Sequence, residues 1–200
     1  MVKLTMLKSR KEYIRMKIFL ETGSGFSGGH DAYGLEIVGS ADSESIVKGC
    51  VESLLSQKEI VDRKIDVLQT NDALATLGEI TDGDILISVH VNLYSDSSGE
   101  GLRGFYRSSR KHNSEKCKAL AITVTKGLHD HVDLYYHGVY NEQRTQVAQL
   151  EPVLQSKGLA ALVEIGLADK RKDQAKNPMF AKNIGEGLCK GILRHLSALH

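Results

Sequence analysis

The chain of 200 residues has few of the features that mark secreted, membrane-spanning or nucleic-acid-binding proteins. Its three cysteines, Cys50, Cys117 and Cys189, are odd in number, and their spacing matches no disulfide framework, metal motif or redox motif. It has only two prolines, and no apolar run approaches the roughly 20 residues of a transmembrane helix. The formal net charge of +1 gives no reason to expect binding to nucleic acid or insertion into a membrane. We therefore expect a globular protein with reduced, buried thiols.

The N-terminus is basic but lacks an apolar stretch long enough for a signal peptide, so we expect synthesis in the cytoplasm without one. Met16 is a plausible alternative start, because the folded pattern begins at Lys17. Residues 1–16 are accordingly predicted to be an N-terminal extension, and residues 17–200 to form one domain.

Apolar segments with strand character alternate with segments of helical periodicity along the whole chain. Strands are predicted over residues 17–21, 64–68, 84–91 and 104–107, and helices over 43–57, 73–79, 114–132 and 180–199, with a further apolar segment at 158–165. Strands that are almost fully apolar are typical of a parallel or mixed sheet covered on both faces. We therefore predict a single α/β domain with a mixed, mostly parallel sheet and helices on both faces.

Two of the apolar segments contain a polar residue that a core does not readily accept. His90 lies near the end of the segment DILISVHVN, and Glu164 lies between Val163 and Ile165. Burying a carboxylate without a partner costs several kcal/mol. An ordinary explanation exists for each residue: His90 as a core histidine bonded to a backbone carbonyl, and Glu164 as half of a buried ion pair. The alternative is a functional site, because ligands gather at the carboxyl ends of strands in such sheets.

Two further residues extend this candidate site. His30 lies in the glycine-rich loop Thr22–Gly34, and Glu44 lies where the first helix is predicted to start. Each also has an ordinary explanation, His30 as a surface loop residue and Glu44 as a first-turn acid favoured by the helix dipole. Together, His30, Glu44 and His90 could supply three ligands to zinc and leave a fourth position open for water, the pattern of a catalytic site.

The sequence also resembles a known family at these residues. Ser88-Val89-His90-Val91-Asn92 and Leu162–Leu167 are similar to motifs of the zinc-dependent N-acetylmuramoyl-L-alanine amidases of the amidase-3 type, which are peptidoglycan hydrolases. Glu44 matches the family's glutamate at the start of the first helix, and Gly101–Tyr106 resembles the segment after the second histidine. The resemblance extends from Lys17 to Leu196.

The resemblance implies an activity and roles for four residues. The protein would hydrolyse the amide bond between N-acetylmuramic acid and L-alanine in peptidoglycan, its macromolecular partner. His30, Glu44 and His90 would bind Zn²⁺, which would polarise the scissile carbonyl. Glu164 would act as general base and pass the proton to the leaving amine. Without a signal peptide, the protein resembles a phage or prophage endolysin that acts on the cell wall after release, and a bacterial lysis enzyme that escapes after cell damage is equally compatible.

One departure from the family motivates an alternative function. The family places its first histidine directly after the first strand, whereas here Gly23 is followed by Ser24, so His30 is taken as the first ligand. The alternative is a catalytically inactive relative that binds wall fragments, or a nucleotide through the Gly23–Gly28 loop, which matches G-x-G-x-x-G. A second histidine cluster, His129-Asp130-His131, is better explained as a solvated helix end.

Overall fold

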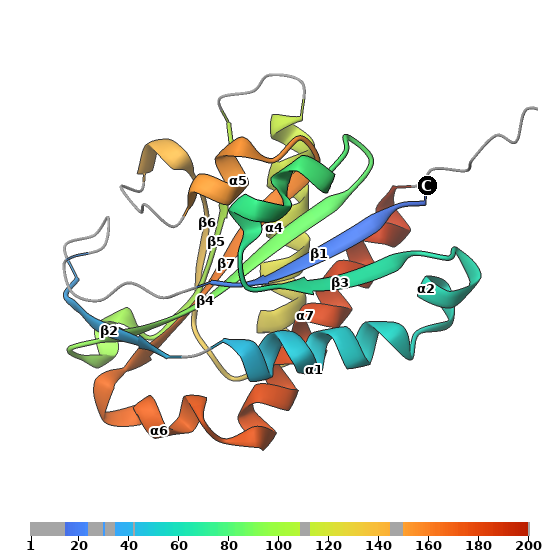
Figure 1. Ribbon diagram of the computed structural model, residues 1–200. Helices are drawn as coiled ribbons and strands as arrows, with labels where there is room; N and C mark the ends of the chain where they lie inside the picture. Colours follow the sequence, from blue (N-terminus) through green and yellow to red (C-terminus); the bar gives the residue numbers. More distant parts are fainter. Residues whose placement is uncertain are drawn as a thin grey trace, which may run out of the picture.

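The fold is that of a seven-stranded mixed sheet flanked by helices (Figure 1). The computed structural model describes residues 15–23, 30, 35–41, 43–108, 113–144 and 150–199. The strands are β1 (Lys17–Thr22), β2 (Ile37–Ala41), β3 (Asp66–Thr70), β4 (Ile85–Tyr94), β5 (Gly101–Tyr106), β6 (Tyr136–Asn141) and β7 (Leu159–Ala168). The α-helices are α1 (Glu44–Leu55), α2 (Lys58–Asp62), α3 (Ala73–Thr76), α4 (Ser114–His129), α5 (Glu151–Gln155), α6 (Lys172–Ala175) and α7 (Pro178–Ala198).

The strand order is β3-β1-β4-β7-β5-β6, and β2 pairs with β4. Strands β3, β1, β4 and β7 are parallel, whereas β5 runs antiparallel to β7 and parallel to β6. The two central strands, β4 and β7, are each ten residues long and buried at every position, which explains their nearly continuous apolar sequence.

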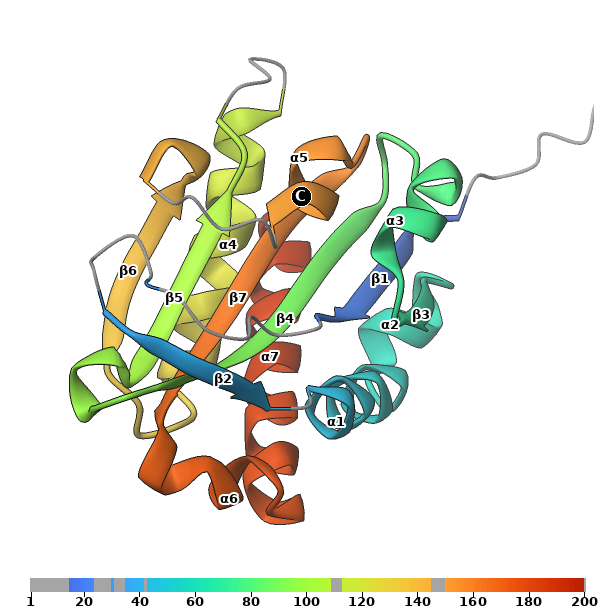
Figure 2. The same cartoon turned by 60° about the vertical axis from the view of Figure 1, so that its left-hand side comes forward.

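Helices cover both faces of the sheet, as predicted from the sequence. Figure 2 shows α4 and α7 behind the sheet and the short helices α3 and α5 in front of it, and α1 packs against α7 and the same core as that helix. The rear core is the larger and includes Ile18, Ile87 and Val163, whereas Phe19, Leu86 and Leu162 belong to the front core. The alternation along each strand therefore sends neighbouring residues into different cores. Within the described residues, no helix has the length and apolar character needed to cross a bilayer.

Two strands were not predicted from the sequence, and several predicted strand boundaries differ from those of the structure. β2 contains Gly39, and among the described strands it pairs with β4 alone, with an irregular register. β6 is an edge strand whose six residues are all partly exposed, so it lacks the alternation that identifies a strand. β3 begins two residues later than predicted, after Lys64 takes a left-handed conformation with φ of 53°. β5 begins at Gly101 rather than at residue 104.

Helices α4 and α7 pack closely because glycines face each other at their contact. A Cβ atom on Gly127 of α4 would lie 2.3 Å from the Cα atom of Gly191 of α7. We predict that Gly127→Ala forces the helices apart and lowers the free energy of unfolding by about 1–3 kcal/mol, the usual cost of overpacking. Urea denaturation measures this change. The control is Gly78→Ala, because a Cβ atom there meets no atom within 4 Å; equal stability of the two variants would contradict the prediction.

Candidate active site

A row of buried polar side chains crosses the front face of the sheet. The row comprises Glu21 on β1, Ser88, His90, Asn92 and Tyr94 on β4, Arg103 on β5 and Glu164 on β7. Alternate residues of a strand point to the same face, so the four β4 residues continue the line begun by Leu86 of the front core. The front face is therefore apolar where β4 begins and polar towards its carboxyl end. We refer to these seven residues as the polar row.

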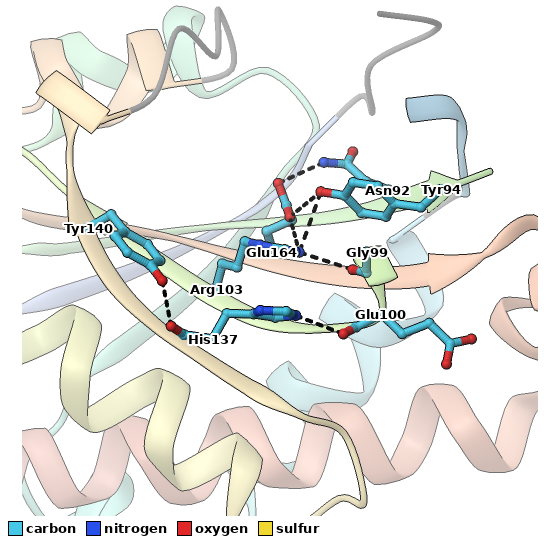
Figure 3. Close-up of polar contacts among 8 residues, drawn as sticks. All are labelled: Asn92, Tyr94, Gly99, Glu100, Arg103, His137, Tyr140 and Glu164. Atoms are coloured by element: carbon cyan, nitrogen blue, oxygen red, sulfur yellow. Dashed lines mark hydrogen bonds and ion pairs between the residues drawn. The ribbon is translucent and has the colours of Figure 1, made fainter. Parts of the chain in front are cut away.

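Glu164 lies directly opposite His90 in the parallel pairing of β4 and β7. Its carboxylate, 2% exposed as a residue, accepts hydrogen bonds from three side chains (Figure 3). Asn92 Nδ2 donates to Oε2 at 2.8 Å, Tyr94 Oη donates to Oε1 at 2.8 Å, and Arg103 Nη1 donates to Oε1 at 3.0 Å. The contacts satisfy both carboxylate oxygens, as a buried carboxylate requires.

Arg103 supplies the positive charge that faces Glu164. It is 2% exposed, its Nη1 also donates to the carbonyl oxygen of Gly99 at 3.1 Å, and its guanidinium lies 5.2 Å from the centre of the Tyr94 ring. Gly166 leaves room for this arrangement, because a Cβ atom there would lie 2.1 Å from the Gly99 oxygen. The buried ion pair considered as an ordinary explanation for Glu164 is thus present, with a partner that the sequence analysis missed. One feature of the sequence could have identified this partner: Arg103 is a single charged residue inside the otherwise apolar segment GLRGFY.

His90 is held by a different part of the polar row. Its Nε2 atom lies 2.8 Å from Ser88 Oγ, and Ser88 also donates a hydrogen bond to the carboxylate of Glu21. Burial lowers the pKa of His90 to about 4, so the imidazole is neutral at pH 7, and burial also raises the pKa of Glu21. The Nδ1 atom of His90 is buried and has no hydrogen-bond partner among the residues that the structure describes. A neutral imidazole with an unused nitrogen can accept a proton or bind a metal ion.

Gly23 and Ser43 lie against His90. The backbone N–H of Gly23 donates to the carbonyl oxygen of Val89 at 3.0 Å, and a Cβ atom on Gly23 would lie only 2.0 Å from His90 Nε2. The imidazole therefore packs directly on the glycine. Ser43, the residue before α1, is 1% exposed, and its Oγ donates to the Gly23 carbonyl oxygen at 3.4 Å.

The structure does not bring the predicted zinc ligands together. His30 is exposed and forms an isolated bridge with Glu36, and Glu44 is exposed at the start of α1, whereas His90 is buried in the polar row. Among the described residues, no three His, Cys, Asp or Glu side chains are placed to hold a metal ion. A catalytic zinc needs three protein ligands, so the residues seen around His90 do not fit the metal. The ligand set His30, Glu44 and His90 stays a prediction that this geometry does not favour.

The other candidate sites receive little support. His129 Nδ1 pairs with the Leu134 carbonyl oxygen, His131 lies near Glu186 and Lys190, and His137 Nε2 donates to the Glu100 carbonyl oxygen, so each has its own partner. Residues 24–29 of the glycine-rich loop lie outside the described part of the chain. The next regular element that the structure describes is strand β2 rather than the helix that a dinucleotide fingerprint requires.

Comparisons with known proteins agree on one family. The family model of the N-acetylmuramoyl-L-alanine amidases matches residues 42–194. The fold is similar to that of an N-acetylmuramoyl-L-alanine amidase from Clostridium difficile 630, with a TM-score of 0.65, 20% identity and coverage of 93% of this chain and 99% of that chain. The amidase Ami1 from Mycobacterium smegmatis gives a TM-score of 0.61 at 12% identity, covering 92% of this chain and 97% of that chain.

A more distant likeness extends to a metallo-carboxypeptidase from Burkholderia cenocepacia, with a TM-score of 0.51, 12% identity and coverage of 93% of this chain and 58% of that chain. At these identities, the solved structures show the fold alone. No curated protein sequence matches the chain. The family model, in contrast, covers most of the chain, and the resemblance noted at His90 and Glu164 lies inside the matched residues. The chain therefore belongs to the N-acetylmuramoyl-L-alanine amidase family.

Proposed function

We propose that the protein hydrolyses the amide bond between N-acetylmuramic acid and L-alanine in peptidoglycan. One observation carries the proposal: His90 and Glu164 lie opposite each other, buried, on two central parallel strands, at the level where the neighbouring parallel strand β1 ends. Ligand sites of α/β sheets are found at this end of the strands. Membership of the amidase family supplies the reaction and the substrate class.

In this proposal, Glu164 accepts a proton from the attacking water and returns it to the leaving amine. Asn92 and Tyr94 fix the direction of its carboxylate, and Arg103 forms an ion pair with it. Zinc, when bound in such enzymes, polarises the carbonyl and activates water. The described residues do not form a three-ligand zinc site, so no step is assigned to the metal.

Digestion of purified peptidoglycan tests the proposal. The protein is incubated with peptidoglycan in the presence of added zinc, and the products are separated and identified by mass spectrometry. We expect peptides with a new free amine on L-alanine, together with glycan strands that retain the lactyl group. Products cut between two sugars or inside the peptide would assign another reaction, and an undigested wall would contradict hydrolysis. Action after release from a cell, as in phage endolysins, stays a prediction.

A second candidate function is binding of muramyl peptides without hydrolysis. Two observations favour it: the carboxylate of Glu164 already accepts hydrogen bonds from three donors, and Glu44, the carboxylate at the start of α1, is exposed. Co-sedimentation with insoluble peptidoglycan separates the two functions. A binding protein would sediment with the wall and release no L-alanine amine, whereas an amidase would release it.

A further inference from the structure

Glu21, Ser88 and His90 form a chain of hydrogen bonds across strands β1 and β4. The Ser88 hydroxyl donates to Oε2 of Glu21, and the same hydroxyl oxygen lies 2.8 Å from Nε2 of His90. All three residues are buried, Ser88 completely, and hydrogen bonds are stronger in such a low-dielectric interior. Nε2 of His90 lies 3.9 Å from Oε2 of Glu21, too far for a direct hydrogen bond. The serine therefore links the acid to the imidazole.

The protons available in this chain fix its direction. A hydroxyl has one proton to donate, and Ser88 donates it to Glu21. Ser88 can then only accept at its contact with His90, so the proton of that contact belongs to Nε2. Burial lowers the pKa of His90 to about 4, so the ring is neutral at pH 7 and carries a single N–H. With this N–H at Nε2, Nδ1 keeps its lone pair.

The backbone of Gly23 covers the Nε2 edge of the same ring. A Cβ atom on Gly23 would lie 2.0 Å from Nε2, 2.2 Å from Cε1 and 2.3 Å from Cδ2 of His90, and Nδ1 is not among these nearest atoms. The N–H of Gly23 holds the glycine there by donating to the Val89 carbonyl oxygen at 3.0 Å. Ser88 and Gly23 thus occupy the Nε2 edge, so a group that reacts with the ring has to use Nδ1.

We propose that Glu21, acting through Ser88, is a positioning residue that holds His90 in the Nε2–H tautomer and makes Nδ1 the nitrogen that accepts a proton or a hydrogen bond during the reaction. The hydrogen bond made by one ring nitrogen sets the protonation of the other. The use of Nδ1 rests on the proposed function. The tautomer does not, because it is a property of the free protein and is measured without substrate.

Nitrogen NMR of the full chain, labelled with ¹⁵N at histidine and held at pH 7 with a chelator, identifies the tautomer. Protonated and unprotonated ring nitrogens differ in chemical shift, and the His90 signals are those that disappear in His90→Gln. We expect the shift of a protonated nitrogen for Nε2 and of an unprotonated nitrogen for Nδ1. In Glu21→Leu the Ser88 hydroxyl is free to donate to Nε2, so the Nε2 shift should move towards the unprotonated value.

The same variant is also expected to hydrolyse peptidoglycan about 10–100-fold more slowly, the usual effect of removing a group that orients a functional imidazole. The matched control is Glu100→Leu. Glu100 also accepts two hydrogen bonds through its carboxylate, but they come from the Ala168 N–H and the Arg171 side chain. We expect the control to keep the wild-type ring shifts and the wild-type rate.

Three results would overturn the inference. They are a wild-type ring with its proton on Nδ1, a folded Glu21→Leu variant whose Nε2 shift equals that of the wild type, and a folded Glu21→Leu variant with the wild-type rate. Circular dichroism and urea denaturation show whether the variant is folded, and the wild-type spectrum tests the tautomer without any variant. Failure of the proposed function is recognised separately, because it appears as an undigested wall and leaves the tautomer unchanged.

Discussion

Replacing Arg103 by methionine is expected to lower the free energy of unfolding by about 3–5 kcal/mol, the usual cost of breaking a buried ion pair from one side. The change removes the guanidinium that forms an ion pair with the carboxylate of Glu164, a residue that is 2% exposed. Tyr94 and Asn92 still donate to the carboxylate, but neither carries a charge. Urea denaturation monitored by circular dichroism measures the loss, which is a large part of the stability of an ordinary domain.

Two further variants show whether the loss comes from the unpaired charge. Arg194→Met removes an arginine from a solvent-exposed pair with Asp130, and it should change the stability little, because water screens such a pair. Glu164→Gln added to Arg103→Met removes the remaining charge while keeping an oxygen acceptor, so it should restore much of the lost stability. The account is wrong if Arg103→Met costs no more than Arg194→Met.

Glu164→Gln alone is expected to reduce hydrolysis of peptidoglycan by about 10²–10⁴-fold, the contribution of a positioned general base. Glutamine has nearly the shape of glutamate and keeps an oxygen that can accept the Tyr94 hydrogen bond, but it does not take up a proton at neutral pH. The rate at which L-alanine amines appear measures the effect. Urea denaturation of the same variant separates lost chemistry from lost folding.

The matched control is Glu100→Gln. Glu100 is also an acid paired with an arginine, Arg171, but this pair is partly exposed, with side-chain exposures of 20% for Glu100 and 38% for Arg171. We expect the control to keep the wild-type rate. If Glu164→Gln hydrolyses the wall as fast as Glu100→Gln, then Glu164 serves only as the counter-ion of Arg103, and the non-hydrolytic function becomes the better proposal.

The sequence by itself determined the fold class and the two central anomalies. The strands β4 and β7 are recognisable because a strand buried on both faces must be apolar along its whole length. The same rule makes His90 and Glu164 conspicuous, because each is a polar residue in a segment that should have none. The weak strands β2 and β6 were missed, since partly exposed strands carry little hydrophobic pattern.

Only the tertiary structure decided how these residues are used. Arg103 is 61 positions from Glu164 in the chain, and it reaches Glu164 because β5 pairs antiparallel with β7 and places the two residues opposite each other. Whether Ser43 or Glu44 points into the protein depends on the residue at which α1 begins. The start of a helix cannot be predicted from sequence to within one residue. The hydrophobic periodicity of a sequence indicates whether a side chain is buried. The order and register of the strands determine which other side chains it contacts.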